Sequence, residues 1–394
     1  MRVLFVDQTA QLGGGELSLL ETLPGLGVEA GTVLFEDGPL RELLQAQGVP
    51  VRVLDCGDLL RVRRSDAAIT VLHAAAPGWH AVGQLRRWQR GHDAVYANSQ
   101  KAFVIAALAG WPSGPPLVWH LRDMLTAAHF NPTIRRVAVW LANHQARVVV
   151  ANSAATAEAF IACGGNPRKV QVIHNGIAAA PFDVPRVAEA AAILVELGLD
   201  EQTHLVGLFG RLAPWKGQHV LLEALVKLPG VHALIVGTAL FGEDAYAARL
   251  YARAERDDLR GRVHFLGFRR DIPALMHVVE VVCHTSVDPE PFGRVIVEGM
   301  LAGRPVIASA AGGAVEILED GVTGLLAPPG DSDALARAIE RLLRNPDLGD
   351  RLGATAAEVA RRDFTLSATQ ARLASLLHDL PVSGAYSRGS AGSR

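Results

Sequence analysis

The sequence predicts an α/β protein built from two parallel-sheet domains, and three observations lead to this prediction. Short apolar runs alternate with helix-period segments through both halves of the chain. The runs are continuously apolar instead of alternating, as strands covered on both faces of a parallel sheet require. The length of 394 residues fits two domains. We therefore expect two doubly wound, Rossmann-like domains facing across a cleft, with ligands beyond the carboxyl ends of the strands.

The first domain is expected over residues 1–180. Its strands are short runs rich in β-branched residues, at 3–7, 32–36, 51–54, 93–98, 116–120, 147–152 and 169–175. Segments with a helical period fall between them, at 16–23, 40–47, 99–109, 133–146 and 153–163.

The second domain is expected over residues 181–364 and repeats the same alternation. Its strands are predicted at 205–210, 232–237, 262–268, 278–286, 305–309 and 324–328. Residues 176–200 contain two prolines and no strong strand, so they are the expected linker. The last residues, 383–394, are rich in serine and glycine, and we expect a disordered tail there.

Composition excludes several classes of protein. The net charge of −2 argues against a dedicated nucleic-acid-binding protein. The three cysteines, Cys56, Cys163 and Cys283, follow no metal-ligand spacing, which favours a reducing, cytoplasmic environment. No secretory signal is expected at the N-terminus. The longest apolar run, 102–111, is well short of the roughly 20 residues that a membrane span needs.

Basic side chains concentrate in the first half of the chain. Residues 59–147 hold 11 basic and 3 acidic side chains. Scattered surface charge accounts for this pattern, and an anionic acceptor or the inner face of the plasma membrane is the alternative. The segments 61–64, 85–90 and 135–140 mix arginines with apolar or aromatic residues, as interfacial helices do, although ordinary amphipathic packing explains them almost as well.

A glycine-rich loop, Gly13-Gly14-Gly15, follows the first predicted strand and precedes a helix. Glycines let the backbone approach a ligand, and the free amides of a helix start suit an anion or a sugar hydroxyl. A tight turn is the alternative interpretation.

The segment 288–298 carries two glutamates, Glu290 before a predicted helix and Glu298 in its second turn. The first-turn amides, from Gly293 to Ile296, have no intrahelical acceptors, so a diphosphate would dock there. Alternatively, Glu290 is a favourable charge at a helix N-terminus, and Glu298 faces solvent.

Two cations, Arg211 and Lys216, follow the predicted strand 205–210. A planar guanidinium and a point-charge ammonium can neutralise a diphosphate leaving group without a metal. Surface cations on a loop are the alternative. In the first domain, His120 and Asp123 stand at the end of strand 116–120 and just beyond it, where a histidine could be structural or catalytic.

These motifs together resemble the retaining GT-B glycosyltransferases of family 4, once called glycosyl transferases group 1. The resemblance is carried by GRLAPWKG at 210–217, the spaced pair Glu290 and Glu298, and AGRPVIASAAGGAVEILEDGVTGLLAP at 302–328. It implies a GT-B fold, a nucleotide-sugar donor held by the second domain and an acceptor held by the first. It also implies that the last helix, near 365–380, crosses back onto the first domain.

The resemblance assigns roles position by position. Residues acting on the reacting groups would be His120, Arg211, Lys216 and Glu290. The donor would be bound by Gly14, Gly15, Arg211, Lys216, Gly237, Phe292, Gly293, Arg294, Val295, Ile296 and Glu298. The acceptor side would be lined by Gly13, His120 and Asp123.

No metal or other cofactor is expected. The triplet Asp331-Ser332-Asp333 has the spelling of an Asp-x-Asp metal motif, but it directly precedes a predicted helix, so Asp331 is interpreted as its N-cap. We expect transfer of a hexose-type sugar to a saccharide or lipid-linked acceptor, in cell-envelope or exopolysaccharide biosynthesis, by front-face attack. The alternatives are a GT-B sugar-nucleotide epimerase and a non-catalytic sugar-nucleotide-binding homologue.

Overall fold

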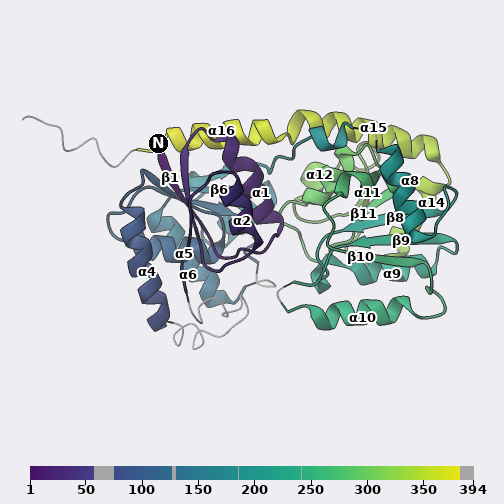
Figure 1. The fold of residues 1–394 in the computed structure, drawn as a ribbon, viewed down its shortest axis with the longest axis horizontal. Coiled ribbons are helices and arrows are strands. Elements are labelled where there is room, and N and C mark those ends of the chain that lie inside the picture. Colours follow the sequence, from purple (N-terminus) through teal and green to yellow (C-terminus); the bar gives the residue numbers. More distant parts are fainter. Residues whose placement is uncertain (57–74, 127–129, 185, 241, 382–394) are drawn as a thin grey trace, which may run out of the picture. The chain divides into compact units, whose positions relative to one another are not determined.

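The computed structural model describes residues 1–56, 75–126, 130–184, 186–240 and 242–381. These residues form two units, Met1–Gly176 with the segment from Leu366 onward, and Ile177–Thr365 (Figure 1). The expected disordered tail at 383–394 and the basic segment at 61–64 lie outside the described residues.

The first unit is built on a seven-stranded, wholly parallel sheet in the order β3-β2-β1-β4-β5-β6-β7. Its strands are β1 Arg2–Asp7, β2 Glu29–Leu34, β3 Val51–Val53, β4 Ala94–Ala97, β5 Leu117–Leu121, β6 Ala146–Ala151 and β7 Val170–Val172. The predicted strands are confirmed within a few residues at each end, because each is a continuous apolar run that the sheet buries on both faces.

Helices cover both faces of this sheet. One face, with Leu4 and Val6 of β1, packs against α4 Ala75–Gln89, α5 Gln100–Gly110, α6 Pro132–Gln145 and α7 Ala154–Ala162. The other face, with Val3 and Phe5, packs against α1 Gly14–Thr22, α2 Pro39–Ala46 and α16 Leu366–His378. The alternation of β1 side chains between two cores follows from the two-residue period of a strand.

Helix α16 therefore belongs to the first unit although it lies at the end of the chain. Its buried Leu373, Leu376 and Leu377 join the core beside β1. Its hydroxyl at Thr369 donates to the carbonyl of His174 at 2.9 Å.

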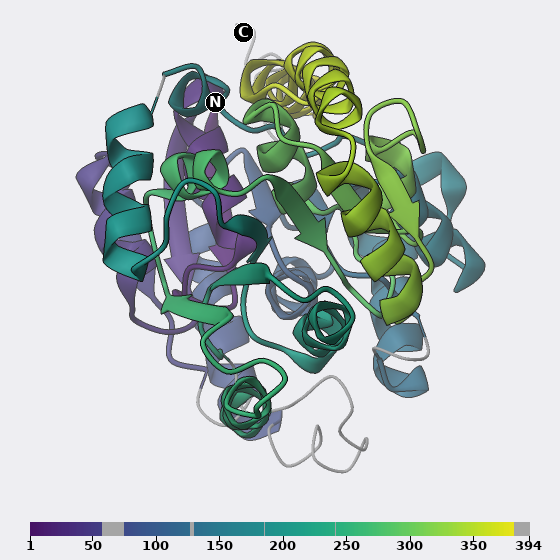
Figure 2. The same cartoon turned by 90° about the vertical axis from the view of Figure 1, so that its right-hand side faces the viewer.

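The second unit contains a six-stranded parallel sheet in the order β10-β9-β8-β11-β12-β13. Its strands are β8 His204–Phe209, β9 Val231–Val236, β10 Val263–Gly267, β11 Val281–His284, β12 Val306–Ser309 and β13 Leu325–Ala327. One face packs against α9 Gln218–Val226, α10 Asp244–Ala254 and α14 Ser332–Leu343. The other packs against α8 Val187–Leu197, α11 Ile272–Val278, α12 Arg294–Leu301, α13 Ala314–Ile317 and α15 Pro346–Asp363. The strands and the helices on the two faces can be followed in Figure 2.

Two sequence-based expectations are wrong in this unit. Residues 187–197, expected within the linker, form α8, which buries Ile193 and ends at Gly198 with φ +67°. A run of good helix formers outweighs the nearby prolines there. The strand predicted over 278–286 is shorter, because α11 ends at Val278 and β11 spans only Val281–His284.

The interpretation of Asp331 as an N-cap is confirmed. Its carboxylate accepts the backbone N–H of Ala334 at 2.8 Å at the start of α14. In the part of the chain that the structure describes, no helix is both long and apolar enough to span a bilayer.

Candidate functional site

The loops after β8 and β11 lie side by side, because these two strands are neighbours in the second sheet. The N–H of Val287 donates to the carbonyl of Trp215 at 2.8 Å. Gly217 has φ +70°, and a Cβ at this position would lie 2.0 Å from the carbonyl oxygen of Thr285. Only glycine allows so close an approach, so the loop carrying Lys216 is fixed against the loop carrying Glu290.

The carboxylate of Glu290 lies at the centre of this contact. One oxygen, Oε1, accepts from Nζ of Lys216 at 2.6 Å. The other, Oε2, lies 2.6 Å from Nε2 of His284 and accepts from the hydroxyl of Ser286 at 2.9 Å. The side chains of Lys216 and Glu290 are only 14% and 12% exposed, so this ion pair is poorly screened by solvent.

Glu290 is ionised in this setting. Burial would raise the pKa of its carboxyl, but the charges and hydrogen bonds of Lys216 and His284 hold that pKa well below its usual range. The site therefore contains a fixed negative charge with two protein donors on one oxygen and a cation on the other.

Trp215 brings the two predicted cations together. The guanidinium carbon of Arg211 lies 5.3 Å from the centroid of the Trp215 ring, and Nζ of Lys216 lies 4.4 Å from it. Both distances are typical of cation–π contacts. The spacing of Arg211 and Lys216 predicted a pair of cations, but not the indole that positions them.

Helix α12 begins as predicted, with Gly293 as its N-cap at φ +102°. One expectation about its first turn is wrong: the N–H of Ile296 donates to the carbonyl of Gly293 at 3.0 Å, because the turn is tightened into an i→i+3 bond. The side chains of Phe292 and Ile296 are core residues, 2% and 0% exposed. Any contribution of these two residues to a ligand would come from their backbone.

Glu298 lies one turn beyond Arg294, with its Oε1 3.5 Å from the Arg294 guanidinium and its side chain 17% exposed. The alternative of a solvent-facing Glu298 is therefore wrong. Gly237, directly after β9, has φ +139°, and a Cβ there would lie 2.0 Å from the carbonyl oxygen of Gly210. Gly237 thus allows close packing against the start of the Arg211 loop.

At the carboxyl edge of the first sheet, a chain of hydrogen bonds links the ends of four strands. The amide of Asn98 donates to the buried carboxylate of Asp7 at 2.5 Å. Arg122 donates from Nε to Asn98 and from Nη1 to Asn175, both at 2.8 Å. The Asn98 amide also reaches the carbonyl of Gly15 at 3.3 Å, which ties the glycine-rich loop to this network.

The glycine-rich loop ends at the start of α1. Gly13 is the N-cap of the helix, and Gly14 is its first residue and exposed. Glu16, in the first turn, lies against Gly13. Burial, together with the charge of Asp7, raises the pKa of the Glu16 carboxyl to about 8.

His120 is on β5 and only 1% exposed. Its Nδ1 is hydrogen-bonded to the hydroxyl of Tyr96, and its Nε2 has no partner among the described residues. Burial and the nearby Arg122 lower the pKa of His120 well below its usual range, so the imidazole is neutral. Asp123, two residues after β5, is partly exposed. The roles assigned to His120 and Asp123 stay predictions.

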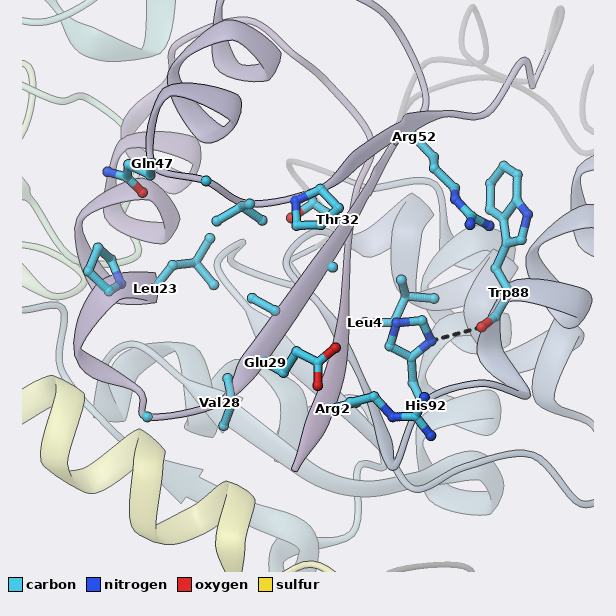
Figure 3. Close-up of a pocket in the computed structure, with 17 residues that line it drawn as sticks. Arg2, Leu4, Leu23, Val28, Glu29, Thr32, Gln47, Arg52, Trp88 and His92 are labelled. Atoms are coloured by element: carbon cyan, nitrogen blue, oxygen red, sulfur yellow. Dashed lines mark hydrogen bonds between the residues drawn. The ribbon is translucent and has the colours of Figure 1, made fainter.

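A hollow of about 540 Å³ lies at the opposite, amino edge of the first sheet (Figure 3). Arg2, Glu29, Arg52, Trp88 and His92 line part of it. The guanidinium of Arg52 covers the Trp88 ring at 5.1 Å, and Nδ1 of His92 is bonded to the Trp88 carbonyl at 2.8 Å. Among its described lining residues there is none that the sequence singled out for the site.

Comparison with known proteins places the chain in a family. Residues 190–359 match the model for "Glycosyl transferases group 1", and residues 17–176 match the model for "Glycosyl transferase 4-like domain". The chain is 39% identical to Anabaena HepE, solved in complex with UDP-glucose, with a TM-score of 0.87 over 96% of this chain and 100% of that one. Sucrose-phosphate synthase of Thermosynechococcus elongatus, 21% identical with a TM-score of 0.77 over 96% of this chain and 98% of that one, shares the fold.

Among curated proteins, the chain is 31% identical over 218 residues to the D-inositol 3-phosphate glycosyltransferase of Mycobacterium marinum. That match covers 55% of this chain and 46% of the relative, so the chain spans about half the length of the curated relatives it matches. The full-length likeness to HepE and the two family models agree with the fold described above. The chain belongs to the GT-B glycosyltransferases of family 4.

Proposed function

We propose that this chain is a retaining glycosyltransferase that moves a hexose-type sugar from a nucleotide-sugar donor to a saccharide or lipid-linked acceptor. One observation carries the proposal: Arg211, Lys216 and Glu290 meet at one edge of the second sheet, with Glu298 on the helix that follows. The similarity to HepE, solved with UDP-glucose, supports a hexose donor. We place the reaction in the cytoplasm, in cell-envelope or exopolysaccharide biosynthesis.

Arg211 and Lys216 stabilise the leaving diphosphate. Breaking a glycosyl–phosphate bond develops negative charge on the phosphate, and preorganised cations lower the barrier by meeting that charge. The N-terminus of α12 adds backbone amides and its dipole at Arg294 and Val295. The two cations supply the charge that a metal would otherwise supply, so activity is expected to survive chelation of divalent ions by EDTA.

The glutamates bind hydroxyl groups of the donor. Glu290 accepts from the sugar, and Glu298 accepts from the ribose. To retain the configuration at the anomeric carbon, the acceptor hydroxyl attacks from the same face of the sugar that the diphosphate leaves. The leaving phosphate takes the proton of that hydroxyl. Glu290 is not the nucleophile in this scheme, because its carboxylate is held by three protein donors. Trapping a glycosyl adduct on Glu290 would contradict it.

The first unit holds the acceptor. Gly13, His120 and Asp123 line its side of the reaction, with His120 presenting a neutral imidazole. Analysis of the reaction product identifies the acceptor. NMR of the same product gives the anomeric configuration of the transferred sugar, which tests retention. A product with inverted configuration would contradict the retaining mechanism.

Helices α4, α5 and α6 support a peripheral contact with anionic lipid. They contain no aspartate or glutamate and carry five cations, Arg86, Arg87, Lys101, Arg135 and Arg136. The rings of Trp111 and Trp140, 41% and 51% exposed, stack at 6.0 Å nearby. Basic and aromatic side chains together favour the membrane interface. Flotation with anionic liposomes tests this contact, and no binding at low salt would remove it.

Donor binding is tested by a thermal-shift panel of UDP-, GDP-, ADP- and TDP-sugars. A donor that binds the folded state raises its stability with the logarithm of its saturation. We expect a UDP-sugar to give the largest shift, and none of the panel shifting the wild type would overturn the proposed function.

A further inference from the structure

His284 is a buried histidine beside the proposed donor site that none of the roles above uses. It is the last residue of β11 and 6% exposed. Its Nε2 lies 2.6 Å from Oε2 of Glu290 and 3.2 Å from the hydroxyl of Ser286. Its Nδ1 is buried and has no partner among the described residues. Among the described residues, Glu290 and Ser286 are therefore the polar partners of this imidazole.

The chemistry of the pair fixes the direction of the hydrogen bond. An ionised carboxylate only accepts, so Nε2 of His284 must carry the proton that meets Glu290. Ser286 donates its hydroxyl to the same oxygen at 2.9 Å. Burying the Nδ1 nitrogen of His284 without a hydrogen-bond partner costs stability. The hydrogen bond from Nε2 to the Glu290 carboxylate offsets this cost.

The two oxygens of Glu290 have different partners. Oε2 is held by His284, the last residue of β11, and by Ser286, two residues further on. Among the described residues, Oε1 has one hydrogen-bond partner, the long, flexible side chain of Lys216. A bound diphosphate attracts the Lys216 ammonium. As that ammonium turns toward the phosphate, Oε1 gains room for another donor while Oε2 keeps both of its bonds.

We propose that His284 is a positioning residue that, with Ser286, holds Glu290 so that Oε1 meets a hydroxyl of the donor sugar once Lys216 binds the diphosphate. This inference rests on the proposed function. His284 does not itself touch the donor. It acts through Glu290, and its effect is therefore on recognition of the sugar and not on recognition of the nucleoside diphosphate.

The test measures the Kd of UDP-glucose and of UDP separately, by calorimetry, for the wild type and variants. We expect His284→Leu to weaken UDP-glucose binding by about tenfold or more, as loss of a hydrogen bond to a charged group does, and to change UDP binding less than about threefold. His284→Gln keeps an N–H near the position of Nε2, so we expect it to restore most of the affinity. His219→Leu, at another histidine of the same unit, is the matched control and leaves both constants unchanged.

Ser286→Ala covers the case in which His284→Leu does not fold, as judged by circular dichroism. It removes one of the two donors to Oε2, and we expect the same selective loss of sugar recognition at about two- to fivefold. Equal loss of UDP and UDP-glucose affinity, or no loss in either variant, would overturn the inference. Failure of the wild type to bind UDP or any nucleotide sugar would instead overturn the proposed function.

Discussion

The carboxyl edges of the two sheets share a topology but differ in chemistry. At the second sheet, an ammonium and a carboxylate meet at 2.6 Å, and Trp215 holds a second cation nearby. At the first sheet, a neutral His120 and a chain of side-chain hydrogen bonds occupy the corresponding edge. Binding of a nucleoside diphosphate needs cationic side chains that can turn from their protein partners to the phosphates. Binding of a neutral sugar hydroxyl needs polar side chains that are held in place. The fold supplies the edge, and the residues after each strand decide what binds there.

The largest effect is expected at Lys216. Lys216→Ala removes a cation from the leaving group and leaves the Glu290 carboxylate buried without its ion-pair partner. We expect kcat/KM to fall by about 10²–10³-fold in steady-state assays, in the range seen when one stabilising group of a transition state is removed. Lys227→Ala, at an exposed lysine paired with Asp333, is the control and should match the wild type.

The next effect concerns the contact between the two loops of the second unit. Gly217→Ala places a Cβ 2.0 Å from the carbonyl oxygen of Thr285, so the loop that carries Lys216 must move. We expect a loss of about 3 kcal/mol in urea unfolding, together with weakened donor binding. Gly230→Ala, also at positive φ but with open space around it, should cost only about 1 kcal/mol. Similar costs for the two variants would show that the close approach does not constrain the loop.

At the edge of the first sheet, Tyr96→Phe removes the hydroxyl bonded to His120 and leaves both ring nitrogens without a partner among the described residues. We expect a loss of about 1–2 kcal/mol in the free energy of unfolding. The Kd of UDP should not change, because the proposed donor site lies in the second unit. The matched control is Tyr251→Phe at an exposed ring. A large change in UDP affinity would contradict the proposal that the first sheet's edge binds the acceptor and the second sheet's edge binds the donor.

The smallest effect is a pH dependence at Glu16. The folded state raises the pKa of this carboxyl from 4.5 to about 8, so the folded chain binds the proton more tightly than the unfolded chain. Glu16 therefore stabilises the fold less as pH rises from about 4.5 through about 8. Between pH 5 and 9 we expect Glu16→Gln to gain about 1 kcal/mol relative to the wild type, because partial exposure weakens the effect. Glu21→Gln on the same helix is the control, and equal pH profiles for all three proteins would refute the assignment.

The strands and the charged residues that follow them could be predicted from the sequence, because continuous apolar runs mark buried parallel strands and loops after them carry ligand groups. Arg211, Lys216 and Glu290 were predicted as candidate residues in this way, and Glu298 was predicted from its place in the second turn of the helix that follows. Helix α8 could not be placed, since prolines near its start made residues 187–197 look like part of a linker.

His284 and Trp215 could not be predicted as parts of the site. Their roles depend on β8 and β11 being neighbours, and no spacing along the chain encodes that pairing. His284 also lies inside a predicted strand, where a histidine is usually interpreted as a core residue. The occupied amide of Ile296 was missed for a similar reason, because helix-start rules do not distinguish an α-turn from a tighter first turn.

The most direct test of the central claim is the turnover of a nucleotide sugar by the wild type and by Lys216→Ala. Release of nucleoside diphosphate from the donor that gives the largest thermal shift is measured with and without EDTA. The wild type is expected to cleave the donor equally well in both conditions, and Lys216→Ala is expected to lose that activity while it stays folded. Unchanged turnover in Lys216→Ala, or loss of wild-type turnover on chelation, would contradict the account.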